Sequence, residues 1–268
     1  MEKSILFQGK SIHFKVEGSG PVLVFLHGFL EDISMWNYHS EVLSKEYQVI
    51  CVDLPGHGET EQWSATHTME FMAETVLQVL NAEGIDKCVM IGHSMGGYTT
   101  LAFAELYPEK LLGFGLFHSH SLSDSEKAKE NRDRTIEIVN KEKFGFISQF
   151  IPSLYAEENR SRLKVEIEHQ IQMAKNMPKE SITAALAGMK LRPMRLDVVV
   201  LSENPVLFIL GKQDSRIPLE SVLAQAATPN VSQINILGHS GHMGWQEESE
   251  TTAIAINGFM KLCLHRVS

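Results

Sequence analysis

The stretch VMIGHSMGGYTTLAFAELYP, Val89 to Pro108, places Ser94 between glycines where a short apolar run meets a helical pattern. The spacing is G-x-S-x-G, with Gly92 two residues before the serine and Gly96 two residues after it. A turn that exposes a hydroxyl at the tip of a strand must bend sharply, and residues without Cβ let the neighbouring backbone approach. We therefore expect a strand, a strained turn at Ser94, and a helix whose positive dipole end faces the serine. A glycine-rich packing turn is the alternative interpretation.

Around this stretch, apolar runs of strand length alternate with helical patterns, which predicts the α/β class. We expect a mainly parallel, doubly wound, eight-stranded sheet covered by helices on both faces. The expected strands lie at residues 4–8, 11–16, 21–28, 47–53, 88–91, 111–120, 205–211 and 232–237. Helices are expected at residues 35–45, 69–82 and 247–264, besides the one that follows Ser94.

The composition changes between residues 121 and 204, which are rich in Lys, Glu, Arg, Gln and Met. Three stretches in this segment, residues 125–144, 160–177 and 178–191, have helical periodicity. We predict a helical cap at residues 121–204, inserted into a core formed by residues 1–120 and 205–268. The charged runs within it are expected to be solvated helix faces. The small residues Ala185 and Ala187 are expected to help set substrate size.

The composition of the chain limits the classes of partner that we expect it to bind. The chain has 268 residues, 24 Lys plus Arg against 33 Asp plus Glu, and a formal charge of −9, so no nucleic-acid partner is expected. No apolar run approaches the roughly 20 residues that cross a bilayer, and no signal-peptide core is evident, so a soluble cytoplasmic protein is expected. Cys51, Cys88 and Cys263 lack metal-ligand spacing and are expected to be reduced and structural. The expected partner is a small molecule.

A serine hydroxyl is a weak nucleophile, so Ser94 needs a base and the base needs an orienting acid. His242 follows the last expected strand in a glycine-flanked loop and is the favoured base, with His239 as its competitor. Asp214 follows the preceding strand and is the favoured acid by chain order. Asp124 is the competing acid, although its position is more typical of a helix N-cap.

Five segments in order carry a resemblance to a known family: FLHGF, DLPGHG, GHSMGG, LGKQD and GHMG. Over nearly its whole length, the chain resembles the α/β-hydrolase superfamily, as a serine esterase-like member with a helical cap. The resemblance implies an oxyanion hole formed by the backbone N–H groups of Phe29 and Met95. It implies no cofactor and no metal.

Other polar residues receive structural interpretations. Asp53, His57 and Gly58 belong to the DLPGHG loop, which is usually architectural in proteins of this type. His118 and His120 form an H-x-H pair without an evident third ligand, so lining of a pocket is favoured over metal binding.

These residues predict a cofactor-independent serine hydrolase that cleaves a small to medium carboxylic ester through an acyl-enzyme on Ser94. No cluster for a highly charged substrate group is evident in the sequence. Amide, thioester and lactone substrates remain open. The same resemblance also covers carbon–carbon bond hydrolases, lyases and haloperoxidase-like enzymes, because fold alone does not choose among activities. A slow-turnover small-molecule receptor is the alternative outside enzymes.

Overall fold

A computed structural model describes residues 1–266. One eight-stranded sheet has the order β1-β2-β4-β3-β5-β6-β7-β8. The strands are β1 (Glu2–Phe7), β2 (Lys10–Glu17), β3 (Val22–Leu26), β4 (Gln48–Val52), β5 (Cys88–His93), β6 (Leu111–Phe117), β7 (Val206–Gly211) and β8 (Ser232–Leu237). β2 runs antiparallel to β1 and β4, and the other pairings are parallel. The predicted α/β class and the eight predicted strands are confirmed.

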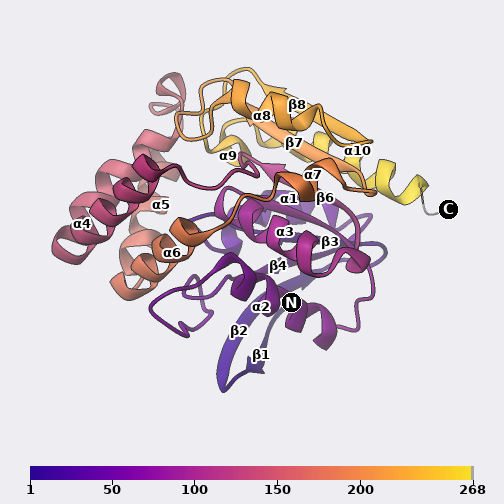
Figure 1. The fold of residues 1–268 in the computed structure, drawn as a ribbon, viewed down its shortest axis with the longest axis horizontal. Coiled ribbons are helices and arrows are strands. Elements are labelled where there is room, and N and C mark those ends of the chain that lie inside the picture. The colour runs from indigo at the N-terminus through magenta and orange to yellow at the C-terminus, as the bar shows by residue number, and fades with distance from the viewer. Residues whose placement is uncertain (267–268) are drawn as a thin grey trace.

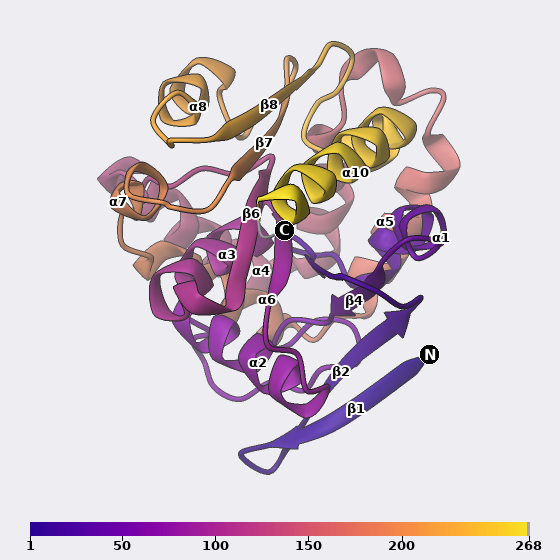
Figure 2. The same cartoon turned by 90° about the vertical axis from the view of Figure 1, so that its right-hand side faces the viewer.

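Helices cover both faces of this sheet. Figure 2 shows α2 (Met69–Ala82), α3 (Met95–Leu106) and α8 (Leu219–Ala226) on one face, with α1 (Asn37–Leu43) and α10 (Ser249–His265) on the other. β5 and β7 are consequently buried at every position, which explains why their sequences are continuous apolar runs. The three cysteines are unpaired and buried in this core, as predicted.

Residues 121–204 are mainly helical. The segment contains α4 (Glu126–Phe150), η3 (Ile151–Leu154), η4 (Glu157–Asn159), α5 (Lys164–Asn176), α6 (Lys179–Leu191) and α7 (Leu196–Val200). α4 packs against α5 and α6, and the three gather beyond one end of the sheet (Figure 1). α7 instead contacts α3 and α8. The division into core and cap stays a prediction. The remaining short helices are η1 (Ile33–Trp36), η2 (Pro108–Lys110) and α9 (Gly244–Glu247).

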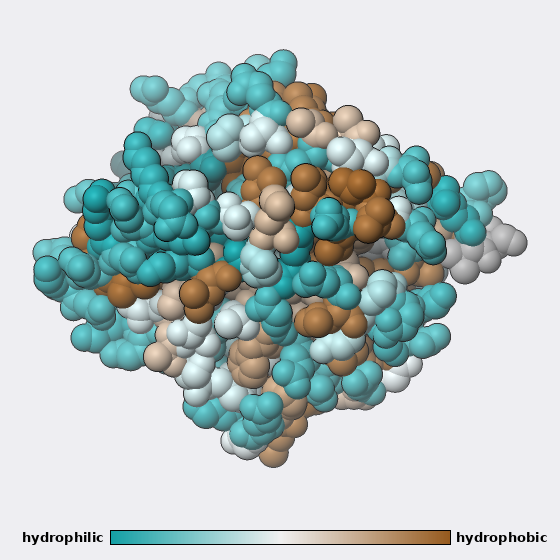
Figure 3. All heavy atoms as spheres, in the orientation of Figure 1, coloured by the Kyte–Doolittle hydropathy of each residue, from teal (hydrophilic) through white to brown (hydrophobic). Residues whose placement is uncertain are grey.

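The hydropathy of the exposed surface differs between the helices of residues 121–204. Figure 3 shows hydrophilic side chains over the outer face of α4 and hydrophobic side chains gathered around α7. The exposed apolar residues near α7 include Val200 and Leu201. The α4 face agrees with the expectation that its charged runs are solvated. Among the described residues, no helix is both long enough and apolar enough to span a membrane.

The parallel strands bring distant loops together. Leu26 pairs with Gly92, His93 pairs with Phe117, and β7 continues the same direction. The chain therefore leaves β3, β5, β6 and β7 at one edge of the sheet, where ligands bind in open α/β sheets. The predicted site residues follow these strands or β8.

Candidate active site

Ser94 occupies the turn between β5 and α3. Its φ of 50° and ψ of −110° are rare for a residue with a side chain, and its N–H donates to the carbonyl oxygen of Phe117 at 2.8 Å. A Cβ at Gly92 would lie 2.1 Å from the carbonyl oxygen of Gly96, and one at Gly96 would lie 2.5 Å from that of Leu26. Both flanking glycines are therefore required by close backbone approach, as the motif predicted.

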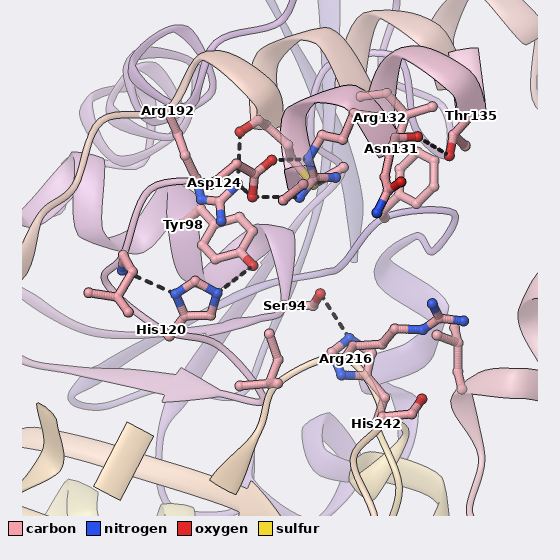
Figure 4. A pocket seen from close by; sticks show the side chains of 18 of the residues that line it. Ser94, Tyr98, His120, Asp124, Asn131, Arg132, Thr135, Arg192, Arg216 and His242 are labelled. Carbon is pink, nitrogen blue, oxygen red and sulfur yellow. Dashed lines mark hydrogen bonds and ion pairs between the residues drawn. The ribbon is translucent and has the colours of Figure 1, made fainter. Parts of the chain in front are cut away.

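A hydrogen-bonded relay leads away from this serine. Oγ of Ser94 lies 2.9 Å from Nε2 of His242, and Nδ1 of His242 lies 2.9 Å from Oδ2 of Asp214 (Figure 4 shows the first contact). Burial opposes ionisation of Asp214, but the neighbouring His242 and the hydrogen bonds from His118 and His242 hold its pKa well below the ordinary value. An ionised Asp214 accepts the hydrogen bond from Nδ1–H of His242, which leaves Nε2 unprotonated and facing the Ser94 hydroxyl.

The competing histidine lies apart from this relay. The side chain of His239 is 79% exposed, and its Nδ1 lies 3.2 Å from a carboxylate oxygen of Glu158. Its backbone lies in the same loop as His242, so the tertiary fold distinguishes two histidines that the sequence places three residues apart.

Asp124 also lies away from the relay. Its carboxylate accepts from Nε of Arg132 and lies 2.7 Å from Nη1 of Arg192. The interpretation of Asp124 as a helix N-cap is wrong. Ser125 caps α4, because its Oγ accepts from the N–H of Ala128, whereas Asp124 is held by Arg132, two turns into α4, and by the distant Arg192.

His118 has a role that the sequence did not reveal. Its Nδ1 lies 2.9 Å from the same Oδ2 of Asp214 that His242 contacts, and burial lowers its pKa to about 4. The expectation that His118 and His120 both line a pocket is wrong for His118. β6 ends at Phe117 and His118 has φ 49°, so the two histidines do not share a strand face. His120 does line the cavity.

Within residues 1–266, His118, Asp214 and His242 are close enough to share a metal ion, with ligand atoms within 4.8 Å of one another. Both Nδ1 atoms face one carboxylate oxygen at hydrogen-bond distance, and Nε2 of His242 faces Ser94. In this arrangement one carboxylate oxygen of Asp214 accepts hydrogen bonds from two imidazole rings.

The predicted oxyanion donors come from two places, the start of α3 and the loop after β3. Met95 is the first residue of α3, where the N–H has no acceptor within its own helix. Phe29 follows β3 in the loop that lines the same cavity as Ser94. Their assignment as an oxyanion hole stays a prediction.

A second buried pair, which the sequence did not reveal, supports this loop. Oε2 of Glu31 accepts from the N–H of Gly28 at 2.6 Å and lies 2.8 Å from Nδ1 of His93. Nε2 of His93 lies 2.9 Å from the carbonyl oxygen of His242. The one signal in the sequence was an acidic residue soon after FLHG, which has no meaning until its buried partner is known.

The hydrogen-bond partners of Glu31 and His93 indicate the charge state of this pair. A carbonyl oxygen can only accept, so Nε2 of His93 donates to it. Burial opposes charge on both groups, but their mutual attraction and hydrogen bonding raise the pKa of His93 and lower the pKa of Glu31. We therefore describe them as an imidazolium–carboxylate pair.

The DLPGHG loop has the expected architectural role. Oδ1 of Asp53 accepts from the N–H of Ile33 at 2.9 Å, and Oδ2 accepts from that of Glu59 at 3.0 Å. Gly58 has φ 52°, and a Cβ there would meet the Asp53 carboxylate. Nδ1 of His57 faces the carbonyl oxygen of Pro55, within the same loop, and contacts none of the residues of the relay.

A cavity of about 530 Å³ adjoins Ser94 and His242. Apolar side chains on its wall include Phe29, Phe146, Phe150, Leu154, Leu186 and Met189. Charged and polar ones include Tyr98, His120, Asp124, Arg132, Arg192 and Arg216 (Figure 4). The expectation of no charged cluster is therefore wrong. The charged residues come from α4 and the loop before it, the end of α6 and the loop after β7, and only folding brings them together.

The chain is similar to known hydrolases. A family model described as alpha/beta hydrolase fold matches residues 21–133. The solved structure of a thermophilic esterase from Thermogutta terrifontis, with malate bound, is 34% identical, with a TM-score of 0.93 over 98% of this chain and 99% of that one.

Curated relatives that match most of this chain have two different kinds of activity in their names. The dihydrolipoyllysine-residue acetyltransferase component of the acetoin cleaving system of Pseudomonas putida is 28% identical over 91% of this chain and 64% of that protein. This chain thus spans less than two thirds of the first curated relatives it matches. A 2-hydroxy-6-oxononadienedioate/2-hydroxy-6-oxononatrienedioate hydrolase of Paraburkholderia phymatum is 26% identical over 89% of this chain and 87% of that protein.

Proposed function

This chain belongs to the α/β-hydrolase superfamily, and on that premise we propose that it is a cofactor-independent serine hydrolase that cleaves carboxylic esters. The observation that carries the proposal is the relay from Oγ of Ser94 through His242 to Asp214, with 2.9 Å at each contact. A nucleophile, a base and an orienting acid in hydrogen-bond reach are the parts that acyl transfer requires. The similarity to a thermophilic esterase supports the choice of an ester bond.

In the proposed reaction, Oγ of Ser94 attacks the carbonyl carbon while its proton passes to Nε2 of His242. The N–H groups of Phe29 and Met95 hold the oxyanion, which is a large contribution in sites of this kind. Collapse of the tetrahedral intermediate expels the alcohol, which takes the proton from His242 and leaves the acyl group on Ser94. Water then attacks the acyl-enzyme with the same base, and Asp214 offsets the imidazolium charge at each step.

We further propose that α4 and α6, in the predicted cap, cover the acyl pocket. Side chains from both helices line the cavity beside Ser94, including Phe146, Leu186 and Met189. A helical layer at this edge excludes water and contacts the acyl group, which would make it the element that selects the substrate.

Carbon–carbon bond hydrolysis is the second candidate, because one relative of that activity matches along 89% of this chain. Ester hydrolysis is preferred because the more similar protein, at 34% identity, is an esterase. Parallel assays with short-chain esters and with a 2-hydroxy-6-oxo-dienoate, read by the loss of its absorbance, separate the two.

The test of the proposal is covalent labelling by a fluorophosphonate together with hydrolysis of an ester panel. We expect labelling and turnover in the wild-type protein and neither in Ser94→Ala, whose kcat should fall by up to about 10⁶. Ser123→Ala is the matched control, since Ser123 lines the same cavity but is not part of the relay. Substantial turnover by Ser94→Ala would refute the proposed nucleophile.

A further inference from the structure

One end of the cavity contains Asp124, Arg132 and Arg192, here named the arginine cluster. Figure 4 shows the Asp124 carboxylate between the two guanidinium groups. Arg132 contacts both carboxylate oxygens, with Nε on Oδ2 and Nη2 3.4 Å from Oδ1. Nη1 of Arg192 lies 2.7 Å from Oδ1. Two cations therefore share one anion.

The charges of this cluster do not balance. Burial opposes ionisation of Asp124, but both arginines hold its pKa below the ordinary value, so it contributes one negative charge against two positive ones. Arg192 is only 5% exposed, and a buried charge without its own counterion is costly. The cavity wall thus has a positive surplus, although the whole chain carries a formal charge of −9.

Neighbouring groups add to this surplus. Arg216 lines the same cavity and lies over the ring of Phe150, with Nη2 2.6 Å from Oγ of Ser153. The other acidic side chain on the wall, Glu31, is paired with His93.

Two hydrogen-bond donors in the arginine cluster or beside it belong to Arg192 and to the neighbouring Tyr98. Nε of Arg192 has no partner among the described residues, and its guanidinium carbon lies 3.9 Å from the ring centroid of Tyr98. Nδ1 of His120 accepts from the N–H of Leu122 at 3.1 Å, so Nε2 bears the proton and faces the Tyr98 hydroxyl at 3.5 Å. Burial lowers the pKa of His120 to about 4, so its ring is neutral. The Tyr98 hydroxyl proton is then free to be donated.

From this placement we propose that the substrate is an ester bearing a carboxylate, which the arginine cluster and the Tyr98 hydroxyl bind while Ser94 attacks the ester carbonyl. The proposal rests on the proposed function. A planar carboxylate matches the fork of donors on a guanidinium, and such charge-assisted contacts are stronger than neutral hydrogen bonds. With the carboxylate on the acyl side, the ester and water give a dicarboxylate, an alcohol and one proton.

A purely structural role for the cluster predicts a different result. In that case Asp124 would only tie α4 to the end of α6, and its removal or that of Arg132 would change stability without changing preference among esters. The two roles are therefore separated by selectivity and not by loss of activity.

The substrates for the test are two matched pairs. Monoethyl adipate and ethyl adipamate differ by a carboxylate against a neutral amide on the acyl side. 4-Acetoxybutyrate and 4-acetoxybutyramide differ in the same way, but the carboxylate or amide is on the alcohol side of the ester. In the wild-type protein we expect kcat/KM for the acid to exceed that for the amide at least tenfold in one pair. A ratio of one or less in both pairs overturns the carboxylate site.

The variants act in opposite directions. Arg132→Gln should lower the acid-to-amide ratio about ten- to hundredfold, as expected for loss of a charge-assisted contact. Asp124→Asn removes the competing negative charge and should raise the ratio. Arg134→Gln is the matched control, because Arg134 is exposed on the same helix and pairs with Glu130. Equal ratios in Arg132→Gln and Arg134→Gln overturn the proposal.

A binding measurement separates this proposal from the proposed function. Adipate should raise the melting temperature of wild-type protein and of Ser94→Ala, but raise that of Arg132→Gln much less. Absence of labelling and of hydrolysis of every ester would refute the hydrolase proposal, whereas hydrolysis without preference or adipate binding would refute only the carboxylate site.

Discussion

Glu31 and His93 form a buried pair, with Oε2 of Glu31 2.8 Å from Nδ1 of His93. The same carboxylate oxygen accepts from Gly28, next to the proposed oxyanion donor Phe29, and the same ring contacts the carbonyl oxygen of His242. One pair thus links the loop after β3, the residue before Ser94 and the backbone of the proposed base. We interpret Glu31 and His93 as positioning residues.

Substitution of Glu31 tests this role. In Glu31→Gln, the amide oxygen can take the place of Oε2 and keep the hydrogen bond from the N–H of Gly28. Because His93 donates through Nε2, its Nδ1 can donate to this amide oxygen only while the ring is protonated. In Glu31→Leu, the Gly28 N–H and the His93 ring lose their partner, at about 1–3 kcal/mol for each buried group left unsatisfied.

We expect kcat to fall at least tenfold more in Glu31→Leu than in Glu31→Gln, with a smaller change in KM. Steady-state kinetics alongside thermal melts provide the measurement. Equal kcat in both variants, whatever their melting temperatures, would show that the pair does not position the site.

The pair also predicts a pH dependence of stability. The pKa of Glu31 is lowered, so its contribution is present above about 4.5 and lost as pH falls. The pKa of His93 is raised, so its contribution is full below about 6.5 and lost as pH rises through the higher value in the folded protein.

The stability difference between wild type and Glu31→Gln should therefore be largest between about pH 4.5 and 6.5 and shrink at alkaline pH. Denaturant titrations at pH 5.5, 7.5 and 9 measure the free energy of unfolding of both proteins. Because other titrating groups contribute equally to both, most of their effect disappears from the difference. A difference that grows with pH would contradict an ion pair.

Replacing Asp214 and replacing Asp124 should have different effects on kcat. Asp214→Asn should lower kcat by up to about 10⁴, because an amide favours the wrong tautomer of His242. Asp124→Asn alters the arginine cluster and should cause a far smaller loss with a neutral ester. The reverse ranking, measured by steady-state kinetics, would move the orienting acid to Asp124.

His118 should tune the acid that it contacts. His118→Phe keeps an aromatic ring but removes the Nδ1 donor at 2.9 Å from Asp214, so the pKa of Asp214 should rise. We expect the acidic limb of the kcat/KM profile to shift to higher pH. An unchanged limb would mean that His242 alone determines the ionisation of Asp214.

Cavity-lining residues of α6 should set acyl length. Leu186 and Met189 line the cavity, whereas Ala185 is buried and does not. Met189→Phe or Leu186→Phe should shift the preferred ester towards shorter acyl chains. Ala185→Phe is the control and should cost about 1–3 kcal/mol of stability through overpacking, with the wild-type profile retained.

The expected outcome is read from kcat/KM across an ester series. The sequence predicts this role for Ala185 and Ala187, because small residues in a helix leave room for a substrate. The structure shows that Ala185 faces the packed interior instead. If Leu186 and Met189 variants keep the wild-type profile, α6 does not select the acyl group.

Local sequence determined the fold class and the elbow at Ser94. Strand and helix periodicities are short-range properties, so the eight strands and α2 were predicted within a few residues. The glycines around Ser94 were equally predictable, since the need for close backbone approach is inherent in a sharp turn. Chain order then indicated His242 and Asp214, because parallel strands deliver their loops to one edge.

Only the tertiary structure decided which side chains meet across the chain. Arg132 and Arg192 converge on Asp124 because α4 packs against α6, and no local pattern encodes that contact. Glu31 and His93 pair because the loop after β3 lies beside the end of β5. Charges that are solvated in a sequence-based view become buried partners in the fold, and a buried charge depends on neighbours that are distant in sequence.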